Sequence, residues 1–241
     1  MLAPPKISIR AHRFRLVVKG VETVVGTSLD VVIVASNPYI SKKWFSKPYT
    51  GAIDVSRECW SLDGVTPDAS VERPFCANCA ACPNNIPDLT QVSEIAEGVV
   101  CLDRRYLAVL PMADPTRVYT LTVVASAIEV LREYMEGLSK SRHNSESVVT
   151  RLGFNDKVDF PKLTFTKKGF VAKKVLGAVK EIGASEEAMR ATRQDTCVSH
   201  IDRPDAAANP DMANLSNGDA GQEILAGDSM DAALKAMFPK D

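Results

Sequence analysis

One cysteine-rich stretch of the chain reads Cys59-Trp-Ser-Leu-Asp-Gly64, then Cys76-Ala-Asn-Cys79-Ala-Ala-Cys82-Pro-Asn84, and ends at Cys101. It contains five of the six cysteines, and the sixth is Cys197 near the end of the chain. Two Cys-x-x-Cys pairs overlap at Cys79, and thiolates at this spacing can both reach one ion. Disulfides or scattered buried thiols are the alternatives, but packing alone explains so tight a cluster poorly. The stretch therefore predicts a structural zinc site with four cysteine ligands.

The predicted zinc ligands are Cys59, Cys79, Cys82 and Cys101, with Cys76 as a spare thiol. A site built on the Cys76/Cys79 pair is the rival interpretation. A catalytic zinc usually keeps an open coordination position and often has a histidine or carboxylate ligand. The stretch from Cys59 to Cys101 contains no histidine. The site is therefore expected to be closed and structural, and to hold a loop in shape.

Length and composition are those of an ordinary globular protein. The chain has 241 residues, of which 45% are hydrophobic and 24% are charged. No segment approaches the roughly 18 consecutive apolar residues of a membrane span. The segment Met1–Lys6 has no apolar secretory core. Cysteine pairs without a secretion signal favour a reducing compartment, so we expect a cytoplasmic protein that binds metal instead of forming disulfides.

Charge is distributed unevenly along the chain. The segment Pro204–Asp241 carries seven acidic and two basic residues, which leaves +4 on the rest of a chain whose net charge is −1. A basic body with an acidic tail is common in proteins that hold nucleic acid, although a solubilising tail is the simpler alternative. Composition beyond residue 183 indicates weak order. We therefore predict a domain at 1–183 and an acidic tail at 184–241.

A segment rich in aromatic and basic residues precedes the cysteines. Between Asn37 and Gly51, four aromatic side chains interleave with three lysines. This composition suits a segment that stacks on unpaired bases while lysines contact phosphates. The alternative is a loop whose aromatic side chains cover the edge of the core. The predicted nucleic-acid contacts are Lys42, Lys43, Trp44, Phe45, Lys47, Tyr49, Trp60, Arg104 and Arg105.

Hydrophobic patterns predict a mixed α+β fold. Strands are expected at 6–18 with a bulge or bend near His12, and at 29–35, 104–110, 117–123, 147–154 and 162–166. One helix should begin near Ser126, through a capping box with Glu129, and a second should follow Gly169. Strands followed by helices fit an OB-like curved barrel or sheet with two packing helices. The zinc-binding loop would be an insertion at 52–103.

Several motifs resemble a family of tailed-phage single-stranded DNA-binding proteins. They are Cys59-x-Ser61-x-Asp63-Gly64-x-x-Pro67, Cys79-x-x-Cys82-Pro83-x-Asn85, Cys101, Leu107–Leu110, Val148–Leu152 and Pro161–Phe165. The likeness spans about residues 28–182, and the chain departs from the family pattern at Ile86-Pro-Asp88, where the family has Gly-Ser. The resemblance implies an OB-like barrel with a zinc-bearing insertion. It also implies a bacteriophage protein of the host-cell cytoplasm that protects and organises single-stranded DNA during replication and recombination.

The sequence also bears on two other classes of function. A zinc-stabilised protein-interaction module that modulates host transcription or replication would share the cysteines and the tail. Catalysis is not expected, because His12, His143 and His200 lie on unrelated segments and no phosphate loop or nucleophile elbow is present. The expected partners are single-stranded DNA, replication proteins through the acidic tail, and further copies of the chain along DNA, with no membrane.

Overall fold

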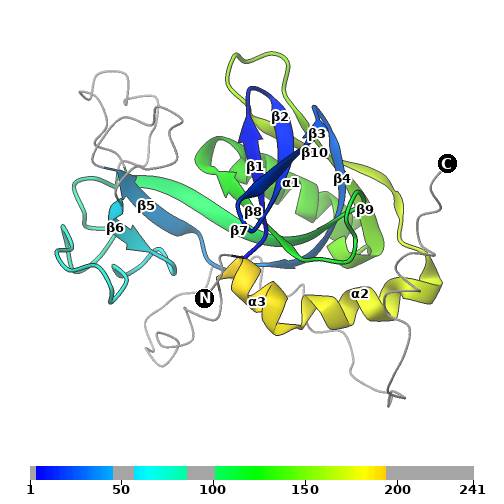
Figure 1. Ribbon diagram of the computed structural model, residues 1–241. Helices are drawn as coiled ribbons and strands as arrows, with labels where there is room; N and C mark the ends of the chain where they lie inside the picture. Colours follow the sequence, from blue (N-terminus) through cyan, green and yellow to red (C-terminus); the bar gives the residue numbers. More distant parts are fainter. Residues whose placement is uncertain (1–3, 46–56, 86–100, 194–241) are drawn as a thin grey trace.

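The computed structural model describes residues 4–45, 57–85 and 101–193 (Figure 1). In these ranges the fold is mixed α+β, with a sheet curled into a half-barrel and three α-helices. This architecture confirms the predicted mixed α+β class with a curved sheet, and it is compatible with an OB-like fold. Within the same ranges, no helix is both long and apolar enough to cross a membrane.

A ten-stranded sheet forms the body, and its main path has the order β10-β9-β4-β7-β8-β1-β2-β3. The strands are β1 (Lys6–Arg10), β2 (Arg13–Val18), β3 (Val21–Gly26), β4 (Leu29–Ser36), β5 (Ser41–Phe45), β6 (Arg57–Ser61), β7 (Cys101–Pro111), β8 (Tyr119–Val124), β9 (Val148–Phe154) and β10 (Leu163–Phe170). Pairing is antiparallel except between β1 and β8. Strand β5 lies between β6 and the first residues of β7, and we call these three segments the arm.

Helices cover both faces of the sheet. Helix α1 (Ala125–Lys140) packs on one face, and α2 (Leu176–Gly183) and α3 (Glu186–Thr192) pack on the other. Side chains alternate between the faces of a strand. Val31 on β4 accordingly joins the core beneath α1, while its neighbour Val32 joins the core beneath α2 and α3. The strand predicted at 29–35 is therefore buried on both faces, as its unbroken apolar run indicated.

Aromatic contacts bring distant parts of the sheet together as it curls. Phe14 on β2 stacks on Phe154 at the end of β9, with ring centroids 4.6 Å apart. The His12 ring centroid lies 5.4 Å from that of the same Phe154 ring, at an angle of 78° between the ring planes. The strand predicted at 6–18, with a bulge or bend near His12, is instead two paired strands. The chain does break near His12, but as a tight turn between β1 and β2, in which Ala11 and His12 adopt positive φ angles of 48° and 55°.

The start of α1 and the end of the packed domain also differ from the predictions. Val124 precedes α1 without a side-chain cap, and Glu129 instead pairs with Arg132, so the predicted capping box is absent. Helix α3 lies beyond the predicted domain end at residue 183. Ser185 caps α3 by accepting a hydrogen bond from the Ala188 amide. The packed fold thus continues to residue 193, and residues 194–241, with Cys197, lie outside the described residues.

Candidate metal centre and nucleic-acid face

Strand register in the arm places two of the predicted zinc ligands on one face. Trp44 on β5 pairs with Cys59 on β6 and with Cys101 on β7. Directly paired residues project from the same side of a sheet, so these three side chains form one row. Lys42, two residues earlier on β5, projects from the same side. We call this side of the arm the cysteine face.

The loop at 62–85 folds back and brings the remaining cysteines of the stretch to this face. The Cys79 amide donates to the Val65 carbonyl at 2.8 Å, and the Cys82 amide donates to the Cys79 carbonyl at 3.3 Å. The Cys101 amide donates to the Asn84 carbonyl at 2.8 Å. The first two bonds lie within the loop, and the third connects its end to the start of β7. Cys79 and Cys82 of the loop line one cavity with Cys59 and Cys101, so the Cys-x-x-Cys segment lies against the cysteine face.

A single small cavity is lined by all five cysteines of the stretch: Cys59, Cys76, Cys79, Cys82 and Cys101. Its volume is about 20 Å³, and roughly 10–15 Å³ is needed to hold one water molecule. The cavity therefore has room for one ion-sized species. All five thiols are free, and their chemistry fits zinc, which takes thiolate ligands. In residues 4–45, 57–85 and 101–193, however, no group of three His, Cys, Asp or Glu side chains is arranged to hold a metal ion directly.

The electrostatics of this cavity favour neutral thiols when no cation is present. Burial raises the pKa of Cys101 to about 12, although the nearby Lys42 ammonium opposes the shift. Burial likewise raises the pKa of Cys79. A coordinating metal ion inverts this effect, because it deprotonates the thiols that bind it. Metal binding at this cavity would therefore release protons.

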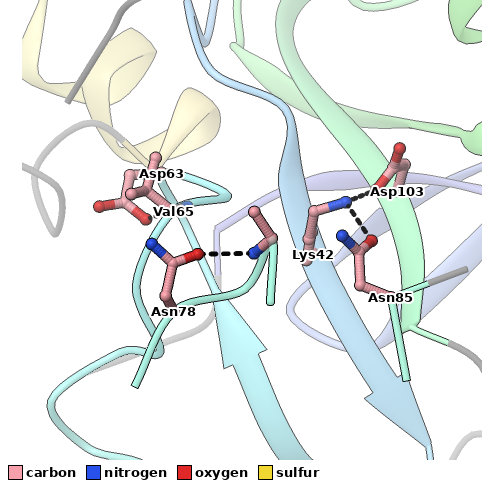
Figure 2. Close-up of polar contacts among 7 residues, drawn as sticks. Lys42, Asp63, Val65, Asn78, Asn85 and Asp103 are labelled. Carbon is pink, nitrogen blue, oxygen red and sulfur yellow. Dashed lines mark hydrogen bonds and ion pairs between the residues drawn. The ribbon is translucent and has the colours of Figure 1, made fainter. Parts of the chain in front are cut away.

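Lys42 connects the loop to the sheet beside the cysteines (Figure 2). Its ammonium donates to Oδ1 of Asp103 at 2.6 Å and to Oδ1 of Asn85 at 2.9 Å. Only 15% of the Lys42 side chain is exposed. Lys42 was predicted to contact phosphates, but a phosphate would have to displace the Asp103 carboxylate from a half-enclosed ion pair. The structure thus places Lys42 in the support of the cysteine loop.

The Asp63-Gly64 turn sets the course of the loop, as its sequence indicated. The Asp63 carboxylate accepts hydrogen bonds from the Val65 amide at 2.8 Å, the Thr66 amide at 3.0 Å and the Ser61 hydroxyl at 2.8 Å. Figure 2 shows Asp63 beside Val65. Burial alone would raise the pKa of Asp63, but these bonds outweigh burial and lower it. Gly64 has φ +73°, and a Cβ atom there would lie 2.2 Å from the Ile40 carbonyl oxygen. Only glycine fits at this position.

Gly64→Ala is expected to destabilise the protein by about 2 kcal/mol or more, because it adds a backbone clash to an unfavourable φ angle. Gly137→Ala is the matched control, since Gly137 lies within α1 and a Cβ there meets nothing within 4 Å. The control should stabilise the protein by roughly 0.5–1 kcal/mol. Denaturant unfolding of the two variants measures both effects. Equal stabilities would contradict the close approach of Gly64 to Ile40.

Trp44 is buried, which corrects its prediction as a stacking platform. Only 8% of the residue is exposed, and the Phe75 ring lies 4.6 Å away at an angle of 62°. Stacking on a base requires an accessible ring face. Trp44 borders the cysteine cavity instead, so its position on β5 helps to form the candidate metal centre.

Arg105 is also buried, which corrects its prediction as a phosphate contact. It is 5% exposed, and its guanidinium donates to the carbonyls of Asn37 at 3.0 Å and Pro38 at 3.1 Å. The Asn37 side chain in turn donates to the Thr192 carbonyl at 2.9 Å. Arg105 therefore stabilises the connection between β4 and β5, next to the end of α3.

Three of the predicted nucleic-acid residues share the opposite face of the arm. Lys43 pairs with Trp60 on β6, and Arg104 on β7 pairs with Ser41 on β5. Because neighbouring residues of a strand project from opposite sides, Lys43, Trp60 and Arg104 project away from the cysteine face. All three are partly buried. We call them the basic–aromatic face.

Other residues near this face were missed in the sequence. Tyr106 lies two residues beyond Arg104 on β7 and packs in a small cluster with Leu62 and Trp60. The guanidinium of Arg193 lies 5.0 Å from the centre of the Tyr106 ring. Arg193 follows α3, so nothing local in the sequence links it to the arm.

The remaining predicted contacts are not located by the structure. Lys47 and Tyr49 lie outside the described residues. Phe45 ends β5, but its side chain is likewise not described.

Comparison of the chain with protein-family models, with curated proteins and with solved structures found no match in any of the three.

Proposed function

We propose that this chain is an OB-like protein that binds single-stranded DNA without sequence preference and is stabilised by zinc in its cysteine loop. The observation that carries the proposal is the strand register of the arm. It groups Lys43, Trp60 and Arg104 on the side of the arm opposite the row of Cys59, Trp44 and Cys101, and Trp60 also borders the cysteine cavity. We assign no catalytic residue.

The chemistry of the basic–aromatic face suits an unpaired strand. Lysine and arginine release counterions from phosphates, and an aromatic ring stacks on bases of any identity. Such stacking is worth roughly 1–3 kcal/mol per base. The net charge of +4 outside the acidic segment 204–241 supports the same ligand. Because none of these interactions reads a base edge, the proposal includes no sequence specificity.

Zinc in this proposal fastens the cysteine loop to the arm. Cys59, Cys79, Cys82 and Cys101 are the ligands, and Cys76 is the spare thiol beside them. The thiolates would draw together around the ion, since zinc–sulfur bonds are about 2.3 Å long. The bound ion supplies folding energy and no chemistry of its own. It holds the loop at 62–85 against the cysteine face, and so sets the position of β6 and of Trp60.

Fluorescence titration with three labelled oligonucleotides tests the proposal. Two are single strands of different base composition, and the third is a duplex. The two single strands should bind with similar Kd values, and the duplex should bind more weakly, because paired bases cannot stack on Trp60. A strong preference for one sequence, or tighter binding of the duplex, would refute a nonspecific single-strand binder.

A protein-interaction module is the second candidate, and edge strand β3 favours it. Val21 and Val24 on this strand are 69% and 49% exposed. They line an open pocket of about 670 Å³, to which Tyr119 also contributes. An extended peptide can add to such an edge through backbone hydrogen bonds. This candidate predicts no affinity for bare oligonucleotides, so the same titration separates the two functions.

A further inference from the structure

A second aromatic and basic surface lies where β10 ends, away from the arm. Phe170 is the last residue of β10 and is 58% exposed. Lys167 Nζ lies 4.8 Å from the centre of its ring. The His143 ring, which comes from the segment after α1, lies 4.9 Å away at an angle of 71°. Two separate segments therefore hold an exposed ring in one orientation.

An irregularity in β10 gives its two adjacent lysines, Lys167 and Lys168, different contacts. The pairing of β10 with β9 shifts between Lys167 and Gly169, so Lys168 is an extra residue in the strand. Lys168 pairs with Asp30. Lys167 instead lies over Phe170. Bulges of this kind redirect side chains, and this one leaves a lysine beside the exposed aromatic ring.

The chain segments that adjoin His143 and Phe170 carry further cations. Exposed basic side chains occur just before His143 and just after Phe170: Lys140, Arg142, Lys173 and Lys174. In the part of the chain that the structure describes, neither these four nor Lys167 forms an ion pair with a carboxylate. The nearby Glu146 is partly buried and lines a small cavity with His143. The charge of this surface is therefore complementary to an anionic ligand.

We infer that Phe170 is a stacking platform for one base of a single-stranded nucleic acid, with Lys167 and its neighbouring cations on the phosphates. The inference rests on the proposed binding of single-stranded DNA and adds a second contact surface to it. An apolar peptide is a poorer fit, because one ring surrounded by lysines and arginines offers little apolar area. A strand that contacts both surfaces would lie along the body between the arm and the end of β10.

The test compares Phe170→Ala with Phe160→Ala in the full chain. Phe160 is 51% exposed and lies before β10, whereas Phe170 is the last residue of that strand. The two variants therefore remove the same exposed side chain near opposite ends of β10. A labelled oligothymidylate is the probe. Phe170→Ala should raise Kd about 5- to 150-fold, the effect of losing one stacked base. Phe160→Ala should leave Kd within about twofold, and Phe170→Tyr should restore tight binding because it keeps the ring.

The outcomes separate this inference from the function on which it rests. If the unaltered chain does not bind the probe, the proposed function fails and the inference fails with it. If the unaltered chain binds but Phe170→Ala and Phe160→Ala give equal Kd values, only the inference is overturned. Thermal unfolding of each variant shows whether the fold persists. A loss of affinity that Phe170→Tyr does not restore would also overturn the stacking role.

Discussion

Removing zinc with a chelator is expected to unfold the cysteine loop and to lower the melting temperature of the protein. A structural zinc ion can contribute on the order of 10 kcal/mol to folding, and the loop at 62–85 has little apolar core of its own. Among its residues, Leu62 and Cys79 are the buried hydrophobic ones. The purified chain should contain about one zinc ion per molecule, as a four-cysteine site requires. Metal analysis and thermal unfolding, with and without chelator, measure both quantities.

Two cysteine substitutions distinguish the ligands from the spare thiol. Cys79→Ser should lose the metal, because Cys79 is buried and its amide is fixed to the Val65 carbonyl. Cys76→Ser should keep it. The four other cysteines that line the cavity complete a four-thiolate set without Cys76. Metal retention by Cys79→Ser together with loss by Cys76→Ser would contradict the predicted ligand set and favour the rival pair.

Substituting the basic–aromatic face is expected to abolish most of the affinity for single-stranded DNA. Trp60→Ala should cost roughly 1–3 kcal/mol of binding free energy, which is about 5- to 150-fold in Kd. Lys43→Gln and Arg104→Gln should each weaken binding uniformly across sequences and reduce the salt dependence by about one phosphate contact. The triple variant should therefore bind about 100-fold more weakly or worse. Fluorescence titration with a labelled single strand measures these changes.

Controls for the face variants address charge and packing separately. Lys157→Gln removes an exposed lysine from the connection between β9 and β10 and should leave Kd nearly unchanged. Trp60→Phe keeps a ring against Leu62 and Tyr106, so it tests whether lost packing explains a weak Trp60→Ala variant. Unaltered affinity of the triple variant would show that the arm is not the binding surface.

The body of the fold followed from local sequence patterns. The unbroken apolar run in β4 predicts a strand buried on both faces. The period of 3.6 residues in α1 predicts a helix with one buried face. Buried Val31, Val32 and Leu131 accordingly lie where their patterns indicated. The turn between β1 and β2 was not predictable in the same way. Positive φ angles are usually signalled by Gly or Asn, and here Ala11 and His12 adopt them.

The nucleic-acid residues were harder to assign, because composition does not reveal the face of a strand. Lys42 and Trp44 share one face of β5, and Lys43 lies on the other. Alternation along a strand predicts that Lys42 and Trp44 lie on one face of β5 and Lys43 on the other. The sequence alone does not show which of these faces carries Cys59 and Cys101. The Arg105 guanidinium bonds to the backbone of Asn37, the residue that follows β4. Such contacts depend on the tertiary fold and leave no local signal.

The salt dependence of binding tests the central claim most directly. The Kd of the full, zinc-loaded chain for a labelled single strand is measured over a series of salt concentrations. Lys43, Arg104 and one cation near Phe170 would make three phosphate contacts. Three contacts predict a slope of about −2 in a plot of log affinity against log salt concentration. A measurable affinity with a flat plot would contradict the account, because an interface built on lysine and arginine must weaken as salt rises.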